Sequence, residues 1–286
     1  MPQWRLSTRM TTTGIAITRP VIHLITGNMA GIAMTGNGRI ARSRTRQTPA
    51  TQTETTQVEF LSQDALYRLM IWLSPAYPVG AFAYSSGIEW AVEAGDIKDV
   101  GTLRDWLDGM LSLGAGINDG ILFAQMHRAV TTGDDARAVE IAELAAAFAP
   151  SRERYEETTR LGRAFVEVTQ AAWPCRALTR LKEIWPGEVA YPVAVATACA
   201  GHAVPLAPAL HAFLTAVVAN WISAGVRLIP LGHTDSQRLL QILEPVVRET
   251  AQRALISDID ALGSAAFRGD LAAIRHETQY TRLFRS

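Results

Sequence analysis

Lysine is almost absent from this 286-residue chain, in which only Lys98 and Lys182 stand among 27 basic residues. A phosphate-binding loop of the Walker type needs a lysine directly between a glycine and a serine or threonine. Neither lysine follows a glycine. Any nucleotide chemistry connected with this chain is therefore expected to come from another protein.

Cysteine is scarce too, since Cys175 and Cys199 are the two thiols of the chain. Two unpatterned cysteines indicate no disulfide framework and are typical of a reducing, cytoplasmic compartment. The six histidines include no HxH, HExxH or CxxH spacing, so no preformed transition-metal site is recognisable. A transient metal contact through His276 and Glu277, or through histidines paired across a dimer, stays open.

Catalytic motifs are missing as well. The sequence has no GxSxG turn, no GxGxxG loop and no recognisable nucleophile–base pair. From the residues we therefore predict a protein that is not an enzyme and holds no stably bound cofactor. The pattern favours an all-helical interaction protein.

Charge is balanced overall but not along the chain. Residues 1–57 contain seven arginines and one acidic residue, Glu54, a net charge of +6, so the remainder of the neutral chain carries −6. An acidic globular part argues against nucleic acid as a partner. Residues 1–57 show no sustained period and are predicted to be disordered. An over-long reading frame with its true start at Met29 or Met34 explains them best, and an organelle-targeting peptide is the alternative.

Helical periodicity begins at Val58 and continues to the last residue. Leu66, Leu69, Met70 and Leu73 follow the i, i+3, i+4, i+7 spacing of one apolar stripe. Alternating runs bounded by hairpin turns are not found. The sequence predicts an all-α fold, with one domain of about ten helices over residues 58–286.

Helix ends are predicted from capping residues and breakers. Thr102 is expected to cap one helix, and Thr234 or Asp235 to cap a later one. Pro245 lies inside a continuing apolar pattern, which predicts a kink or a stop near Glu244.

Residues 189–226 form a run of 38 residues without an aspartate, glutamate, lysine or arginine. A membrane span needs about 20 consecutive apolar residues. Here prolines, histidines and an asparagine interrupt the run. Two buried helices, over residues 190–202 and 207–226, are the favoured interpretation, and such helices can also serve a homodimer interface.

Two segments are unusually constrained or unusually rich in interface residues. Residues 73–93 pack two prolines and two glycines among aromatic and hydroxyl side chains, which fixes a specific backbone path between two helices. Residues 273–286 form a tail with one acid, Glu277, and are expected to be mobile in the free chain. Their tyrosine, arginine and phenylalanine residues are of the types that anchor interfaces.

Three blocks resemble a known family. Residues 74–95 read SPAYPVGAFAYSSGIEWAVEAG, residues 223–245 read SAGVRLIPLGHTDSQRLLQILEP, and residues 274–286 read IRHETQYTRLFRS. A fourth, looser block is SRERYEETTRLGRAF at 151–165. In content and order they resemble the UreF family of urease accessory proteins. The resemblance runs from about residue 60 onward and does not cover residues 1–57. Departures from the family pattern are small: Ala81, Ala83, His233 and Thr281.

The resemblance implies a non-catalytic scaffold for urease maturation. Such proteins are helical homodimers that bridge a UreD/UreH-type accessory protein and a nickel-carrying UreG-type GTPase, and the complex delivers nickel to apo-urease. The alternatives are a general helical interaction protein or a regulator of a partner GTPase outside urease maturation. Carried over as candidate partner-binding residues are Tyr280, Arg282, Leu283, Phe284 and Arg285 in the tail, and Pro78, Gly80, Phe82, Tyr84, Ser85, Gly87 and Glu89 in the first block.

A mechanism follows from the resemblance. The tail is expected to become ordered on binding, so that Tyr280 and Phe284 are buried while Arg282 pairs with a carboxylate or carbonyl group.

Overall fold

The computed structural model describes residues 61–286, and over this range it contains α- and 3-10 helices and no strand, which confirms the predicted all-α class. The predictions for residues 1–57 lie outside the described residues. The α-helices are α1 (Gln63–Trp72), α2 (Ile88–Glu93), α3 (Val100–Leu113), α4 (Ala115–Thr132), α5 (Asp135–Ala147), α6 (Arg152–Ala172), α7 (Arg176–Ile184), α8 (Tyr191–Gly201), α9 (Leu206–Leu228), α10 (His233–Ile256) and α11 (Phe267–His276). Short 3-10 helices span Ala81–Ala83 (η1) and Ile259–Ala261 (η2).

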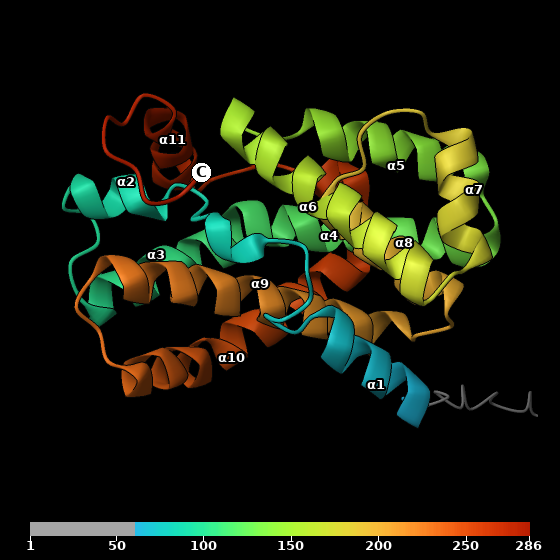
Figure 1. Ribbon diagram of the computed structural model, residues 1–286, viewed down its shortest axis with the longest axis horizontal. Coiled ribbons are helices and arrows are strands. Elements are labelled where there is room, and N and C mark those ends of the chain that lie inside the picture. Colours follow the sequence, from blue (N-terminus) through green and yellow to red (C-terminus); the bar gives the residue numbers. More distant parts are fainter. Residues whose placement is uncertain (1–60) are drawn as a thin grey trace, which may run out of the picture. The chain divides into compact units, whose positions relative to one another are not determined.

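Helices α4, α8 and α9 supply the centre of the core (Figure 1). Eight of the eleven residues of α8 are buried, as are nine residues of α9. The ring centroids of Phe123 on α4 and Phe213 on α9 lie 5.1 Å apart. An uncharged helix can be buried on several sides at little desolvation cost, which explains why the run 189–226 became the interior.

The two buried helices predicted for that run are confirmed, at Tyr191–Gly201 and Leu206–Leu228. By length and composition α9 could cross a membrane. Half of its most apolar window is buried inside the protein.

Three predicted helix ends are corrected. Asp99 caps α3 by accepting the Thr102 amide, and Thr102 bonds back to the Asp99 amide as the third residue of a capping box. Helix α10 already begins at His233, where Asp235 accepts the amide of Gly232. Of the kink or stop predicted near Glu244, the stop is wrong, because α10 continues through Pro245 to Ile256.

An aromatic cluster attaches α1 and the following loop to the body. Trp72 meets Phe165 and Trp173 edge-on, with centroids 6.2 Å apart in both cases. Tyr77, in the loop after α1, donates or accepts a 2.8 Å hydrogen bond at Thr169 of α6. These contacts fix residues 73–80, which lead directly into η1 and α2.

Candidate partner-binding site

The C-terminal tail lies against the turn-rich first block, although almost 200 residues separate them in sequence. In Figure 1 the dark-red segment after α11 runs beside α2, and the C-terminus lies next to both. The amide of Ser85 donates to the Ser286 carbonyl oxygen at 2.8 Å, and the Arg285 amide donates to the Ala83 carbonyl oxygen at 2.9 Å. The two segments that the sequence singled out therefore form one site.

Glu89 is the centre of this site. It lies in the first turn of α2 and is buried, with 7 % of its surface exposed. Its carboxylate accepts the backbone amides of Leu283 at 2.6 Å and Phe284 at 2.9 Å. The same carboxylate faces Nε2 of His276 at 3.1 Å. One buried side chain thus satisfies two amides of the tail and one ring nitrogen of α11.

Glu153, in the first turn of α6, holds the tail from the opposite side. One of its oxygens lies 2.6 Å from Nδ1 of His276, and the other accepts from the guanidinium of Arg282 at 2.6 Å. Four ionisable groups from α2, α6, α11 and the tail are therefore joined in one chain, in the order Glu89, His276, Glu153 and Arg282.

A second buried polar cluster lies beneath the tail, around Ser86. The Ser86 hydroxyl donates to Glu157 at 3.0 Å and accepts from Arg154 at 2.7 Å and from the Trp221 indole nitrogen at 3.0 Å. Arg154 also pairs with Glu157 at 2.5 Å. The Ser286 hydroxyl donates to the other Glu157 oxygen at 2.5 Å. A hydroxyl has one donor and two acceptor positions, and Ser86 uses all three.

Gly87 allows α2 and α11 to approach closely. Its φ is +83°, and a Cβ at this position would lie 2.7 Å from the backbone nitrogen of Ala273. Gly80 also has a positive φ, +79°, but open space surrounds it. Gly87 is therefore required by both conformation and packing, and Gly80 by conformation only.

The structure divides the predicted site residues into a base and an outer face. Glu89, Gly87, Ser85, Tyr84 and Phe284 are buried and form the base. The guanidinium of Arg227 lies over the ring of Phe284, 4.3 Å from its centroid, and burial lowers the pKa of Arg227. Exposed on the outer face are Tyr280 (103 %), Phe82 (69 %), Leu283 (66 %), and also Arg282, Arg285 and Pro78. Gly80 is half-buried.

Two of the contacts that the tail was expected to make on binding are already made within this chain. Phe284 is already buried, and Arg282 already pairs with a carboxylate of the same chain, Glu153. Tyr280 is fully exposed. Composition predicted a mobile end because it counts few apolar residues, whereas the tail is held mainly by hydrogen bonds to buried carboxylates.

His276 and Glu277, for which the sequence left a transient metal contact open, point to different partners. Both ring nitrogens of His276 face other carboxylates, and a Glu277 oxygen accepts the Arg152 amide at 2.8 Å. Among residues 61–286 no group of three or more metal-ligating side chains converges.

Glu153 and Glu157 were missed as site residues. They are four residues apart on α6, a spacing that places both side chains on one face of a helix. That spacing, in the looser fourth block, was the available signal. The signal was easy to overlook, because the same helix also has i, i+4 arginine–glutamate pairs on its exposed face, such as Arg152 with Glu156.

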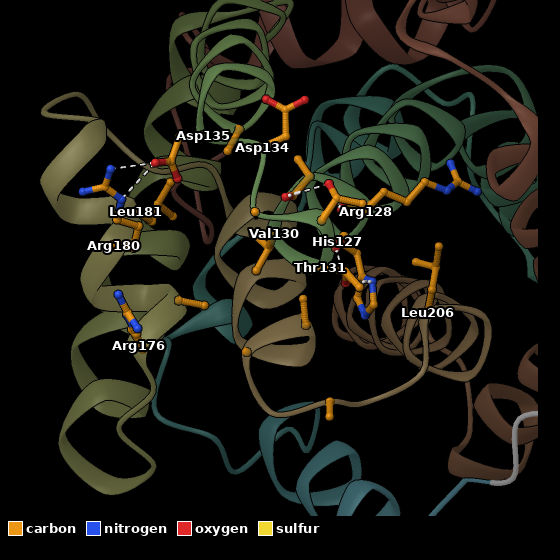
Figure 2. Close-up of a pocket in the computed structure, with 18 of the residues that line it drawn as sticks. His127, Arg128, Val130, Thr131, Asp134, Asp135, Arg176, Arg180, Leu181 and Leu206 are labelled. Atoms are coloured by element: carbon orange, nitrogen blue, oxygen red, sulfur yellow. Dashed lines mark hydrogen bonds and ion pairs between the residues drawn. The ribbon is translucent and has the colours of Figure 1, made fainter.

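A cavity of about 810 Å³ opens elsewhere, between α7, the α4–α5 turn and the α8–α9 loop (Figure 2). Figure 2 shows Arg180 and Arg176 on one side and His127 with Thr131 on the other. Arg180 donates to Asp135 at 2.6 Å, and His127 Nε2 lies 2.8 Å from the Val204 carbonyl oxygen. Arg128 and Asp134 also line this cavity, and they too make structural bonds, to the Leu255 carbonyl oxygen and to the Arg137 amide.

Two smaller cavities, of about 210 and 170 Å³, share Asp119, Arg154 and Thr158 as lining residues. Burial raises the pKa of Asp119 to about 6, against the lowering effect of Arg154. These cavities lie directly behind the Arg154–Glu157 pair that supports the tail.

Comparison with known proteins identifies the family. A family model described as UreF matches residues 97–244. A urease accessory protein UreF of Rhodopseudomonas palustris (strain BisA53) is 64 % identical over 222 residues, which cover 78 % of this chain and 93 % of the relative. The chain belongs to the UreF family of urease accessory proteins.

Other UreF relatives give the same result. A UreF of Bradyrhizobium diazoefficiens is 61 % identical over 78 % of this chain and 92 % of its own length. A UreF of R. palustris (strain BisB5) is 58 % identical over 82 % of this chain and 97 % of its own length. Membership gives the chain a role in urease maturation and places it in an accessory family rather than a family of enzymes. The match of the family model ends before the tail.

Proposed function

We propose that this UreF chain is a non-catalytic scaffold that bridges a UreD/UreH-type accessory protein and a UreG-type GTPase, so that nickel reaches apo-urease. Nickel is cargo of the assembled complex in this proposal, and the chain itself holds no resident cofactor. We place it in the cytoplasm as a homodimer. Support comes from the family and from the absence of a Walker lysine in a chain that would work beside a GTPase.

One observation carries the proposal: exposed aromatic and aliphatic side chains stand on a base of buried, hydrogen-bonded polar groups. Phe82, Tyr280 and Leu283 are each at least 66 % exposed, while the backbone that carries Leu283 is bonded to buried Glu89. Exposed side chains on an ordered backbone lose little entropy on binding, which is the arrangement expected of interface anchors. The arginines of the tail, Arg282 and Arg285, add charge at the edge of this face.

The test is co-expression of the urease structural and accessory genes with and without this chain. We expect urease nickel content and urea hydrolysis to fall together when the chain is omitted. Arg282→Ala should lose co-purification of the partners, and Arg248→Ala, an exposed arginine on α10, is the matched control. Full nickel content and activity without the chain would contradict the proposal.

The same preparations test the alternative, regulation of a partner GTPase. We expect the purified chain, added with the UreD/UreH-type protein, to change nickel transfer more than the rate of GTP hydrolysis. A change in GTP hydrolysis with no effect on urease nickel would favour the alternative.

A further inference from the structure

Helix α11 has an exposed apolar face in addition to the face that it buries. Phe267, Leu271 and Ile274 follow one another at i, i+4 and i+7, so they lie on one side of the helix. Their exposed fractions are 75 %, 41 % and 47 %. The buried side of α11, with Ala272 and Ala273, packs against α2. Large apolar side chains gathered on one exposed face are typical of an interaction surface.

A groove of about 590 Å³ opens between this end of α11 and α3, and we call it the α3–α11 groove. On the α3 wall, Trp106, Met110 and Leu113 repeat the i, i+4, i+7 spacing. Met110 is buried, whereas Leu113 is 47 % exposed. The amide of Ala265 donates to the Leu113 carbonyl oxygen at 2.8 Å, which joins the segment before α11 to the end of α3. Two apolar helix faces therefore border one fixed groove.

The groove has negative charge along its edge. Asp96 and Asp105 line it against one base, Arg268, whose guanidinium pairs with Asp96. Residues 93–108, which lead into α3 and form most of it, contain five acidic and two basic residues, a net charge of −3. A ligand that carries basic groups beside an apolar face is complementary to this arrangement.

We propose that the α3–α11 groove binds an amphipathic helix of a partner protein, with apolar residues at i, i+4 and i+7 and basic residues beside them. Helical peptides bind in this way when their apolar face enters a groove between helices. The ten residues of α11 offer a wall of about 15 Å, nearly three turns of such a helix. This site goes beyond the proposed function, because the groove opens at the N-terminal end of α11 and the tail follows its C-terminal end.

The charge argues against a second copy of this chain as the occupant. In a two-fold contact the same patch faces itself, so the carboxylates of residues 93–108 would lie opposite their own copies and repel. An anionic lipid surface is unfavourable for the same reason. A partner strand finds no sheet edge to join, since residues 61–286 contain no strand.

The first experiment titrates the full chain with a fluorescent peptide of about 18 residues, five helical turns, made of leucine and lysine with leucine at i, i+4 and i+7. A leucine–glutamate peptide of the same pattern is the comparison. Fluorescence anisotropy gives both affinities. We expect the lysine peptide to bind and the glutamate peptide to bind about tenfold more weakly or less.

Variants of the groove locate the binding. The double variant Phe267→Ser and Leu271→Ser should bind the lysine peptide about tenfold more weakly, with an unchanged thermal midpoint because both side chains are exposed. Ile242→Ser, at a 44 % exposed position on α10, should bind as the unmodified chain does. Asp105→Arg leaves the apolar walls intact and should weaken the lysine peptide but not the glutamate peptide.

Equal affinity for the two peptides would overturn the proposal. So would undiminished binding of the lysine peptide by both the double variant and Asp105→Arg. Loss of self-association in the double variant would show that the groove serves a second copy, which also overturns it.

The native occupant is identified with a photoreactive benzoylphenylalanine in place of Phe267, in the full chain co-expressed with the urease genes. The cross-linked segment, read by mass spectrometry, should have apolar residues at i, i+4 and i+7 and more lysine and arginine than aspartate and glutamate. A cross-link to an acidic segment or to a second copy, or no cross-link, would overturn the proposal. Intact co-purification of the accessory proteins in that case would leave the proposed function standing.

Discussion

Glu89 accepts the backbone amide of Phe284 at 2.9 Å, although the two residues are 195 positions apart in the sequence. The bond joins α2 to the end of the chain and is one of three that the same buried carboxylate makes. It shows that the first block and the tail are two halves of a single surface, with Glu89 as their common support.

Replacing Glu89 by glutamine should detach the tail. The amide side chain lacks the charge that two backbone N–H groups and His276 share, so the free energy of unfolding is expected to fall by about 2–3 kcal/mol. Glu93→Gln, an exposed change on the same helix, should alter it by less than about 0.5 kcal/mol. Urea denaturation measures both. Equal free energies of unfolding for the two variants would show that the bonds of Glu89 do not stabilise the protein.

Gly87→Ala and Gly95→Ala separate backbone strain from close packing. Both glycines have positive φ, +83° and +77°, but only a Cβ at Gly87 meets neighbouring backbone, at Ala273. Strain in the left-handed region costs about 1–2 kcal/mol per residue, which is the loss expected for Gly95→Ala. Gly87→Ala should lose about 3 kcal/mol or more, because α11 must also move. Thermal unfolding gives the comparison, and similar losses would contradict the packing argument.

Asp119→Asn should stabilise the protein at neutral and alkaline pH. The pKa of Asp119 is raised from 3.8 to about 6, so the folded chain binds this proton more tightly than the unfolded chain does. The stability that the proton gives is complete below pH 3.8 and is lost as the pH rises through about 6. We expect a gain of up to about 2 kcal/mol at pH 8 that vanishes near pH 4.

Urea unfolding across this pH range tests the prediction for Asp119. Asp260→Asn, at an exposed aspartate, is the control. A gain that is the same at every pH would show that the carboxyl of Asp119 does not titrate in the way its burial implies.

The exposed pair Tyr280 and Leu283 should matter for binding and not for folding. Truncating both to serine removes two large exposed side chains and leaves the backbone bonds of the tail in place. Each interface anchor typically contributes more than about 1 kcal/mol, so partner affinity should fall by about tenfold or more. The thermal midpoint should stay unchanged.

Ile256→Ser is the matched control for that pair, because it removes an 88 % exposed apolar residue at the end of α10. Pull-down of the co-expressed accessory proteins measures the effect. Undiminished binding by the Tyr280 and Leu283 variant would exclude the tail face as the contact surface.

Much of the fold was accessible from sequence because local chemistry determines it. The uncharged run 189–226 had to be buried, and helical spacing set the apolar faces. The N-cap of α3 is Asp99, three residues before the predicted Thr102. At α10, Thr234 or Asp235 was predicted as the cap; the N-cap position is Gly232, and Asp235 takes part by accepting its amide. Pro245 misled because its missing N–H removes one bond from a long helix but does not end it.

The site was only half predictable. Residue types and block order pointed to the first block and the tail as site segments. They did not show that Glu89 lies under the tail, or that Phe284 is buried while Tyr280 is exposed. Those facts depend on contacts across almost 200 residues. Glu153, Glu157 and His276 looked like ordinary helix-surface or solvated groups, since a sequence does not show which charges are desolvated together.

The distance along the chain between Glu89 and the tail also determines how this region folds and opens. Closing a loop of roughly 200 residues has a large entropic cost, about 4–5 kcal/mol by the logarithmic length dependence. The polar bonds of the tail can offset this cost only when the intervening helices have already formed. The tail is therefore expected to attach late, on a preformed helical core, and to open on its own well below the free energy of global unfolding. The face proposed to meet other proteins would then be a separate cooperative unit, able to rearrange while the rest of the chain stays folded.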